Sequence, residues 1–381
     1  MRHMKILLMT DGITPFSKGG MQRHSQLIAE ALASLGHQVT VYHYTESNTK
    51  PNIDEAFSEK ARRSIRHRWF YYSDSGRFPG HYVRAQKRMS KEYLKAYREE
   101  GGQYDFVYTK GFMGWALLNK RVATDPKIGV KLHGMNMFQP QPDWRGRLSK
   151  YLLRPIAKEV MRKSDVVFSY GGKITEVIKD HCKTQVLEIP TGIDKSWLHS
   201  SIEQPSDPIK FLFVGRHDRV KGLPELYDAL RLLEKNRTDW QAHFVGPIPE
   251  EHRLDSDRVV FHGAIYDSSQ LKNVYRQCDV LVNCSISEGM PNVILEAMAC
   301  GLAVLATDVG ATSVLVEDQW NGILISRADP QLIKNGLESM LDLPRERLSE
   351  WKSNSLEAAH GKTWETIGPI LEGELRTCIQ G

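Results

Sequence analysis

The sequence predicts an α/β protein built from two doubly wound domains in tandem, each a parallel sheet covered by helices. Short, nearly continuous apolar runs alternate with helix-length amphipathic segments along almost the whole chain, which is typical of strand–helix–strand units. The alternation pauses once, in a polar stretch with three prolines at residues 189–208. The length of 381 residues also favours two cores of ordinary size over a single one.

The first half contains six predicted strands, each an apolar run between polar segments. They are residues 5–9, 38–44, 106–109, 128–133, 166–170 and 185–189. Between the first two, residues 22–36 have helical spacing, and Gly36 suits the C-terminal end of that helix.

The second half resumes the pattern after the polar stretch. Its predicted strands are residues 210–215, 241–246, 258–263, 279–284, 302–307 and 322–326. Helices fit at 223–235 and 268–278, and a last helical segment at 364–379 follows the completed second sheet. In such sheets ligands bind at the carboxyl ends of the strands, and a cleft between two facing domains is expected.

Cysteine usage and hydropathy predict a cytoplasmic protein. The five cysteines are scattered, odd in number and without a CxxC pair, which favours a reducing compartment and argues against a disulfide framework or a zinc site. The apolar run at the N-terminus is too short for a signal peptide. Every apolar stretch falls short of the roughly 18 residues that a transmembrane helix needs.

Positive charge is concentrated in two segments. Residues 60–100 carry twelve Lys and Arg against four Asp and Glu, and include the basic, aromatic stretch RRSIRHRWFYY at 62–72. A second basic run follows Trp144 and consists of Arg145, Arg147, Lys150, Arg154, Lys158, Arg162 and Lys163. These segments are either solvated helix faces or a surface for anionic lipid or a phosphate-bearing acceptor. A nucleic-acid partner is not expected, because the net charge is only +5 and no binding motif accompanies the patches.

The stretch SEGMPNVILEAMACG at 287–301 places Glu288 and Glu296 at the two ends of an apolar run. It follows the predicted strand 279–284, so its first residues form the loop at a strand's carboxyl end. Pro291 suits the first turn of a helix that stops at Gly301. Amides at Asn292, Val293 and Ile294 would then form an anion site.

Glu296 lies on one helical stripe with Asn292 and Cys300, and the other faces of this helix are apolar. A buried carboxylate without partners costs several kcal/mol in order of magnitude. Either this stripe faces water, or Glu296 meets hydrogen-bond donors such as sugar hydroxyls.

The extended stretch SEGMPNVILEAMACGLAVLATDVGA, with its two glutamates eight residues apart, resembles the signature of retaining GT-B glycosyltransferases of family 4. Other segments resemble that family in the expected order. They are residues 18–42, His133-Gly134, IPTGID at 189–194, FVGRHDRVKGLPELYDAL at 213–230, FHGAIYD at 261–267 and KTWETIGPILEGEL at 362–375. The resemblance spans nearly the whole chain and is weakest from about residue 45 to residue 100.

The resemblance implies a GT-B fold, in which two Rossmann-like domains face a cleft. The acceptor-binding domain would span residues 1–190 and the nucleotide-sugar-binding domain residues 191–362. A C-terminal helix at 363–379 would cross back to the first domain. The implied reaction is retaining transfer of a hexosyl unit from a UDP- or GDP-linked sugar to a glycan or lipid-linked glycan in bacterial surface polysaccharide synthesis. The inner face of the cell membrane is a candidate location, and the 62–72 stretch is the candidate lipid contact.

The resemblance also implies a site. The catalytic set is His133, Arg216, Lys221 and Glu288; the donor-binding set is Gly19, Gly20, Ile265, Gly289, Met290, Pro291, Asn292, Val293 and Glu296. The two cations would bind the diphosphate, Glu296 the ribose hydroxyls, and Glu288 the hydroxyls of the donor sugar. Without the resemblance, Arg216 and Lys221 would be ordinary surface charges and His133 a structural residue.

No metal or other cofactor is expected, because fixed cations would take the place of a metal. Asp255-Ser256-Asp257 matches the Asp-x-Asp motif of metal-dependent transferases, but it precedes a strand within a highly charged loop. Two alternatives stay open: a GT-B nucleotide-sugar 2-epimerase, which needs no acceptor, and an inert GT-B subunit that supports a partner enzyme.

Overall fold

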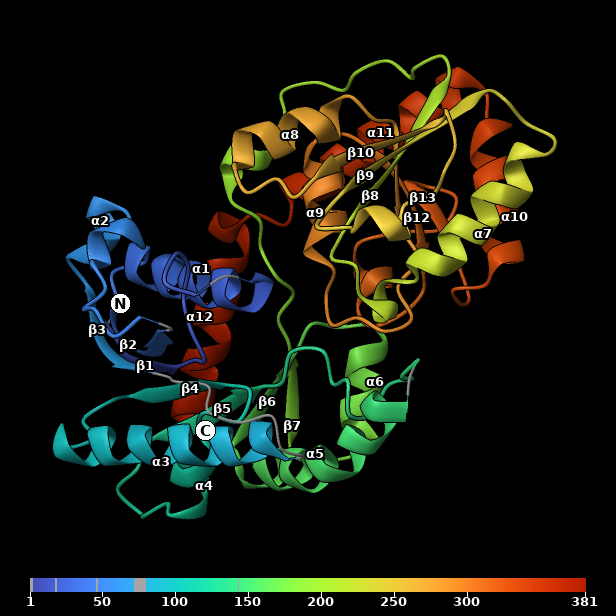
Figure 1. Ribbon diagram of the computed structural model, residues 1–381. Coiled ribbons are helices and arrows are strands. Elements are labelled where there is room, and N and C mark those ends of the chain that lie inside the picture. Colours follow the sequence, from blue (N-terminus) through green and yellow to red (C-terminus); the bar gives the residue numbers. More distant parts are fainter. Residues whose placement is uncertain (1–2, 18, 46, 72–79, 143) are drawn as a thin grey trace. The chain divides into compact units, whose positions relative to one another are not determined.

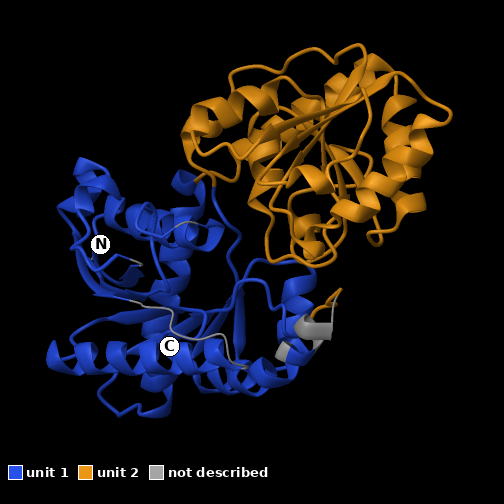
Figure 2. Cartoon of the chain, viewed as in Figure 1, with its two compact units in different colours: residues 1–138, 147–192, 364–381 blue, residues 139–146, 193–363 orange. Residues whose placement is uncertain are grey.

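The computed structural model describes residues 3–17, 19–45, 47–71, 80–142 and 144–381. The chain forms two compact units (Figure 2). Unit 1 comprises residues 1–138, 147–192 and 364–381, and unit 2 comprises residues 139–146 and 193–363. This division differs from the predicted one at residues 139–146, which group with unit 2, and by one or two residues at the two other boundaries, where 191–192 belong to unit 1 and 363 to unit 2.

The described residues of unit 1 form a seven-stranded parallel sheet in the order β3-β2-β1-β4-β5-β6-β7. Its strands are β1 (Lys5–Met9), β2 (Gln38–Thr45), β3 (Ile65–Tyr71), β4 (Phe106–Lys110), β5 (Lys127–Lys131), β6 (Val166–Ser169) and β7 (Gln185–Glu188). Strands β1, β4 and β5 each have a neighbouring strand on both sides. Their residues are therefore almost all buried, which explains their continuous apolar runs.

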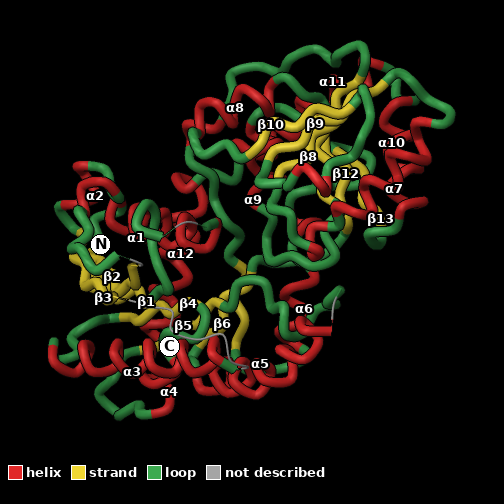
Figure 3. The backbone as a smooth tube through the Cα atoms, viewed as in Figure 1, coloured by secondary structure: helices red, strands yellow, loops and turns green. Residues whose placement is uncertain are grey.

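Helices cover both faces of this sheet (Figures 1 and 3). One face packs against α1 (Gly20–Ser34), α2 (Glu59–Arg62) and α12 (Trp364–Gln380). The other face packs against α3 (His81–Glu99), α4 (Trp115–Asn119), α5 (Trp144–Lys163) and α6 (Lys173–Lys179). The C-terminal helix α12 buries Ile367, Leu371 and Leu375, which lie at helical spacing, in the core of unit 1.

Strand β3 was not among the predicted strands, because its basic and aromatic residues were interpreted as a surface segment. It forms the edge of the sheet and pairs with β2 from Val39↔Ile65 to Thr45↔Tyr71. Arg68 lies 2.7 Å from Glu99 and 3.1 Å from Glu100 at the end of α3. The ring of Phe70 packs 4.7 Å from that of Tyr93. Part of the 62–72 stretch therefore makes contacts within the fold of unit 1. Tyr72 lies outside the described residues.

Unit 2 contains a six-stranded parallel sheet among its described residues, in the order β10-β9-β8-β11-β12-β13. Its strands are β8 (Ile209–Val214), β9 (Trp240–Val245), β10 (Val259–Gly263), β11 (Val280–Asn283), β12 (Ala303–Thr307) and β13 (Gly322–Ile325). Its helices are α7 (Leu223–Glu234), α8 (Ser268–Arg276), α9 (Asn292–Ala299), α10 (Pro330–Leu341) and α11 (Arg345–His360). All six strands predicted for the second half are present, and their ends shift by no more than one residue.

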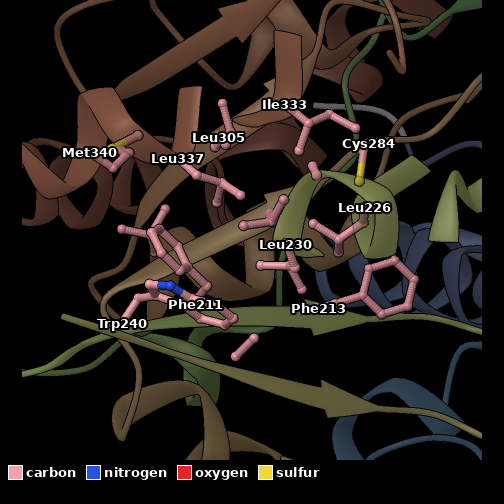
Figure 4. Packing of buried hydrophobic residues seen from close by; sticks show 14 of the residues in the cluster. Phe211, Phe213, Leu226, Leu230, Trp240, Cys284, Leu305, Ile333, Leu337 and Met340 are labelled. Atoms are coloured by element: carbon pink, nitrogen blue, oxygen red, sulfur yellow. The ribbon is translucent and has the colours of Figure 1, made fainter. Parts of the chain in front are cut away.

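Figure 4 shows the core of unit 2. Leu226 and Leu230 of α7 and Leu337 of α10 pack on Phe211 and Trp240 of the sheet. This order of strands puts β8 and β11 next to each other, with their following loops at the same edge of the sheet. The predicted α/β fold of two doubly wound sheets is confirmed. In the described part of the chain, helices are all too short or too polar to span a membrane.

Candidate active site

The loop between β8 and α7 lies directly against the loop between β11 and α9. Gly222 has a φ of +68°, and a Cβ at this position would lie 1.9 Å from the carbonyl oxygen of Cys284. The amide of Ile286 donates to the carbonyl oxygen of Val220 over 2.8 Å. Only glycine combines this backbone conformation with such a close approach. The two loops that carry Lys221 and Glu288 are thus joined at the carboxyl edge of the sheet.

Lys221 and Glu288 form an ion pair within this edge. The Lys221 Nζ lies 2.6 Å from Glu288 Oε1, and the Ser285 hydroxyl donates to the same oxygen over 2.7 Å. Both side chains are partly buried, with exposed fractions of 24% for Lys221 and 12% for Glu288. An ammonium carries three donors, so Lys221 can keep this contact while it donates to a ligand oxygen.

The loop after β12 holds the backbone of the Glu288 loop from the other side. A Cβ at Gly310 would lie 2.4 Å from the carbonyl oxygen of Glu288, and the residue has a φ of +62°. The amide of Ala311 donates to the carbonyl oxygen of Gly289 over 2.8 Å. The loops after β8 and β12 therefore hold the Glu288 loop from two sides.

Helix α9 begins at Asn292, directly after the buried residues Met290 and Pro291. Pro291 stands one position before the helix, and its carbonyl oxygen accepts from the amide of Ile294 over 3.0 Å. The prediction of an anion-facing amide at Ile294 is therefore wrong. The amides of Asn292 and Val293 belong to the first turn, where an α-helix supplies no acceptor of its own. These two donors and the helix dipole favour an anion at this point.

Glu296 lies one turn further along α9 and is half-buried. Its Oε2 accepts a hydrogen bond from the hydroxyl of Tyr275, a fully buried residue of α8, over 3.0 Å. Cys300, on the same stripe, is buried. The sequence left two explanations for this stripe, exposure to water or hydrogen-bond donors for Glu296. Glu296 has such a donor, and this donor is the protein's own Tyr275.

Arg216 and Ile265 lie on the loops after β8 and β10. The Arg216 side chain is 78% exposed, and its guanidinium is 3.9 Å from the carboxylate of Asp218. Ile265 is half-buried and precedes Asp267, whose side chain caps α8. Arg216 is thus not drawn into the Lys221–Glu288 pair.

The predicted residues of unit 1 lie at the carboxyl edge of its own sheet. Gly19 precedes α1 and Gly20 begins it, and both are exposed. His133 follows β5, and its Nδ1 is 2.8 Å from the hydroxyl of Tyr170. Burial, together with the nearby Lys110 and Lys131, lowers the pKa of His133 well below its usual value. His133 is therefore a neutral imidazole at neutral pH.

Two buried lysines at this edge were not anticipated. Lys110 ends β4, and its Nζ donates to the carbonyl oxygen of Met21 (2.9 Å) and to the Ser25 hydroxyl (2.6 Å). Lys131 ends β5, and its Nζ donates to the carbonyl oxygen of Ile189 over 2.7 Å. Burial lowers the pKa of Lys110 to about 7 and lowers the pKa of Lys131 well below its usual value. The signal in the sequence was a lysine at the end of an otherwise apolar strand, a position where a charge is costly.

Acidic, histidine and cysteine side chains are the groups that could ligate a metal ion in this chain. Within residues 3–17, 19–45, 47–71, 80–142 and 144–381, they form no group of three or more that could hold a metal ion. Asp255 and Asp257 are exposed in the loop before β10, and Ser256 between them donates to Glu234 over 2.7 Å.

Two family models match the chain. The model described as Glycosyltransferase Family 4 matches residues 18–197, and the model described as Glycosyl transferases group 1 matches residues 208–342. A D-inositol 3-phosphate glycosyltransferase of Arthrobacter sp. strain FB24 is 31% identical, over 92% of this chain and 88% of that protein. TuaC of Bacillus subtilis strain 168, a proposed teichuronic acid biosynthesis glycosyltransferase, is 25% identical over 82% of this chain and 83% of its own.

Solved structures share the fold. A sucrose-phosphate synthase from Thermosynechococcus elongatus matches with a TM-score of 0.78 and 20% identity, over 98% of this chain and 99% of that one. The Anabaena protein Alr3699/HepE in complex with UDP-glucose matches with a TM-score of 0.68 and 20% identity, over 98% and 100% of the two chains.

The two doubly wound sheets are those of the GT-B fold. The chain belongs to glycosyltransferase family 4, as its sequence predicted.

Proposed function

We propose that this chain moves a hexosyl unit, with retention of configuration, from a nucleotide-diphosphate sugar to a hydroxyl of a saccharide or lipid-linked saccharide in bacterial surface glycan synthesis. The observation that carries the proposal is the grouping of Lys221, Glu288 and the first turn of α9 at one edge of the sheet of unit 2. The UDP-glucose in the Anabaena structure supports the donor class, with UDP or GDP as the nucleotide. The teichuronic acid role proposed for TuaC supports the acceptor class.

The demanding part of this reaction is the negative charge that builds on the departing diphosphate. Lys221 and the amides of Asn292 and Val293 are fixed by the backbone contacts described above, so they need little rearrangement to meet that charge. Arg216, which is largely exposed, adds a second cation. In this proposal these groups take the place of a metal, and no cofactor is needed.

The two glutamates have separate roles in the proposal. Glu296 accepts from the ribose hydroxyls. Glu288, with the backbone of Gly289 and Met290, binds the hydroxyls of the donor sugar. His133 contacts the transferred sugar as a neutral imidazole, which can donate or accept one hydrogen bond. The turn at Gly19 and Gly20 admits a phosphate close to the backbone, and the backbone at Ile265 contacts the base.

A thermal-shift panel of UDP-, GDP- and ADP-linked sugars tests the donor class, since a ligand that binds only the folded protein raises its melting temperature. We expect one nucleotide series to stabilise the protein. Glu296→Ala should weaken binding or turnover of that series at least about tenfold, equivalent to about 1.4 kcal/mol. Unchanged binding in Glu296→Ala would remove the ribose assignment.

Incubation with donor alone separates a 2-epimerase, which converts the donor, from a transferase. Nucleotide binding without turnover for any acceptor would indicate an inert subunit.

We also propose that unit 1 contacts an anionic membrane surface through α5 rather than through the 62–72 stretch. Leu148, Tyr151 and Leu152 are 53%, 71% and 48% exposed and lie on one stripe of α5. Lys158 and Arg162 continue that stripe and are exposed too. Exposed apolar side chains can enter the membrane interface, and exposed basic side chains next to them attract anionic headgroups.

Vesicle sedimentation tests this contact. We expect the protein to sediment with anionic but not with neutral vesicles, and the triple variant Leu148→Ser/Tyr151→Ser/Leu152→Ser to lose most of that binding. Val122→Ser, which changes another exposed apolar side chain of unit 1, is the matched control and should bind as the parent does. Binding that ignores both lipid charge and the triple substitution would exclude the contact.

A further inference from the structure

Tyr275 connects helix α8 to the glutamate assigned to the ribose. Its side chain is fully buried, and its hydroxyl lies 3.0 Å from Glu296 Oε2. The ring packs edge-on against Trp197, with centroids 5.9 Å apart. Burial first, and then the charge of Glu296, raise the pKa of Tyr275 well above its usual value. The hydroxyl therefore stays protonated, and it donates its hydrogen bond to the carboxylate at 3.0 Å rather than to the more distant carbonyl oxygen of Val293 at 3.5 Å.

The contact joins a rigid partner to a flexible one. A glutamate has three side-chain torsions, and ordering them on ligand binding has an entropic cost. Tyr275 has two torsions, and its ring is fully buried and packs against Trp197, which restricts the position of its hydroxyl. A carboxylate can accept about four hydrogen bonds, so one from Tyr275 is compatible with two more from a diol.

We propose that Tyr275 is a positioning residue whose hydroxyl holds the Glu296 carboxylate in the orientation that accepts both ribose hydroxyls, and that it thereby sets the preference for ribose over 2′-deoxyribose. This inference rests on the proposed role of Glu296. A carboxylate held in place cannot turn to follow a single remaining hydroxyl. A 2′-deoxy ligand therefore leaves the Glu296 carboxylate without one of its hydrogen bonds. An unpaired polar group of this kind is what makes polar recognition selective.

The substitution Tyr275→Phe tests the proposal, because it removes the hydroxyl and keeps the ring against Trp197. We expect KM for the nucleotide sugar to rise about three- to tenfold, the range that the loss of one ordinary hydrogen bond gives, and kcat to stay within about twofold. The second measurement is the ratio of Kd values for the ribonucleoside and 2′-deoxyribonucleoside diphosphates, UDP and dUDP or the GDP pair. Tyr275→Phe should reduce this ratio at least about threefold.

The chain offers a matched control in Tyr227→Phe. Tyr227, on α7 of the same unit, is also buried, and among the described residues its hydroxyl has no hydrogen-bond partner. Its removal should leave KM, kcat and the Kd ratio at parent values. Should Tyr275→Phe fail to fold, Glu296→Asp breaks the same contact by shortening the acid, and it should reduce the Kd ratio in the same way.

The outcomes separate the two proposals. If Glu296→Ala binds nucleotide as the parent does, the ribose assignment fails, and the role of Tyr275 fails with it. If Glu296→Ala weakens binding while Tyr275→Phe keeps the parent's KM and Kd ratio, only the positioning role is overturned. A Tyr275→Phe variant that loses kcat without any change in the Kd ratio has a structural defect, which also overturns it.

Discussion

Substituting Lys221 by alanine is expected to lower kcat for sugar transfer by about a hundredfold. The proposed reaction places growing negative charge on the diphosphate, and loss of one preorganised contact of this kind typically costs about 3 kcal/mol of barrier. Lys221 sits on a loop that Gly222 and Val220 join to the Glu288 loop, so its position is fixed before any ligand binds. Steady-state kinetics with the donor found in the thermal-shift panel would measure the loss.

Two further variants identify the cause of that loss. Arg219 lies in the same turn and pairs with Glu225 over 2.7 Å, so Arg219→Ala removes a nearby positive charge and should leave kcat within about twofold. Lys221→Arg keeps the charge and should restore a large part of the activity. The charge explanation fails if Lys221→Ala turns over at the parent's rate, or if Lys221→Arg is as slow as Lys221→Ala.

Most of the fold could be predicted because it follows from local patterns. The buried strands of both sheets read as apolar runs of strand length, and the helices between them have helical spacing. Strand β3 lacks that signal. An edge strand is covered less completely than a central one, so it tolerates arginine and histidine along its length. Arg68 is accommodated by Glu99 and Glu100, which are some thirty residues further along the chain, and a pattern of neighbouring residues does not contain that pairing.

The candidate site also has a part that could be predicted from the sequence and a part that could not. The loop of Glu288, the start of α9 and the glycine turn beside Lys221 are local in sequence, and the resemblance to family 4 located them. The partners of those residues come from elsewhere in the chain. Tyr275 reaches Glu296 from the preceding helix, and in unit 1 Lys110 at the end of β4 donates to Met21 of α1. Such partners are fixed by the packing of the sheet, so they become visible only when the strand order is known.

The largest effect on stability is expected from Lys352→Met in unit 2. Lys352 on α11 and Asp279 before β11 are each 1% exposed, and the Lys352 Nζ lies 2.9 Å from Asp279 Oδ1. Asp279 also accepts from the amides of Ser206 and Lys210, so it fastens the entry of the chain into β8 as well. Removing the lysine leaves a buried carboxylate without its counter-ion, which typically costs about 3–5 kcal/mol.

For a unit of this size, a loss of that magnitude lowers the melting temperature by about 10 °C. Calorimetry with hydrogen exchange on β8 and β11 would assign the loss to unit 2, which matters because a two-unit chain need not unfold in one step. Arg231→Met is the matched control, since its pair with Asp228 on α7 of the same unit is largely exposed, at 57% for each side chain, and should contribute no more than about 0.5 kcal/mol. Equal melting temperatures for the two variants would mean that Asp279 is satisfied by its backbone donors alone. Because the pair fastens the amino ends of β8 and β11, opposite the carboxyl edge that carries Lys221, Lys352→Met should retain parental kcat at temperatures where it stays folded.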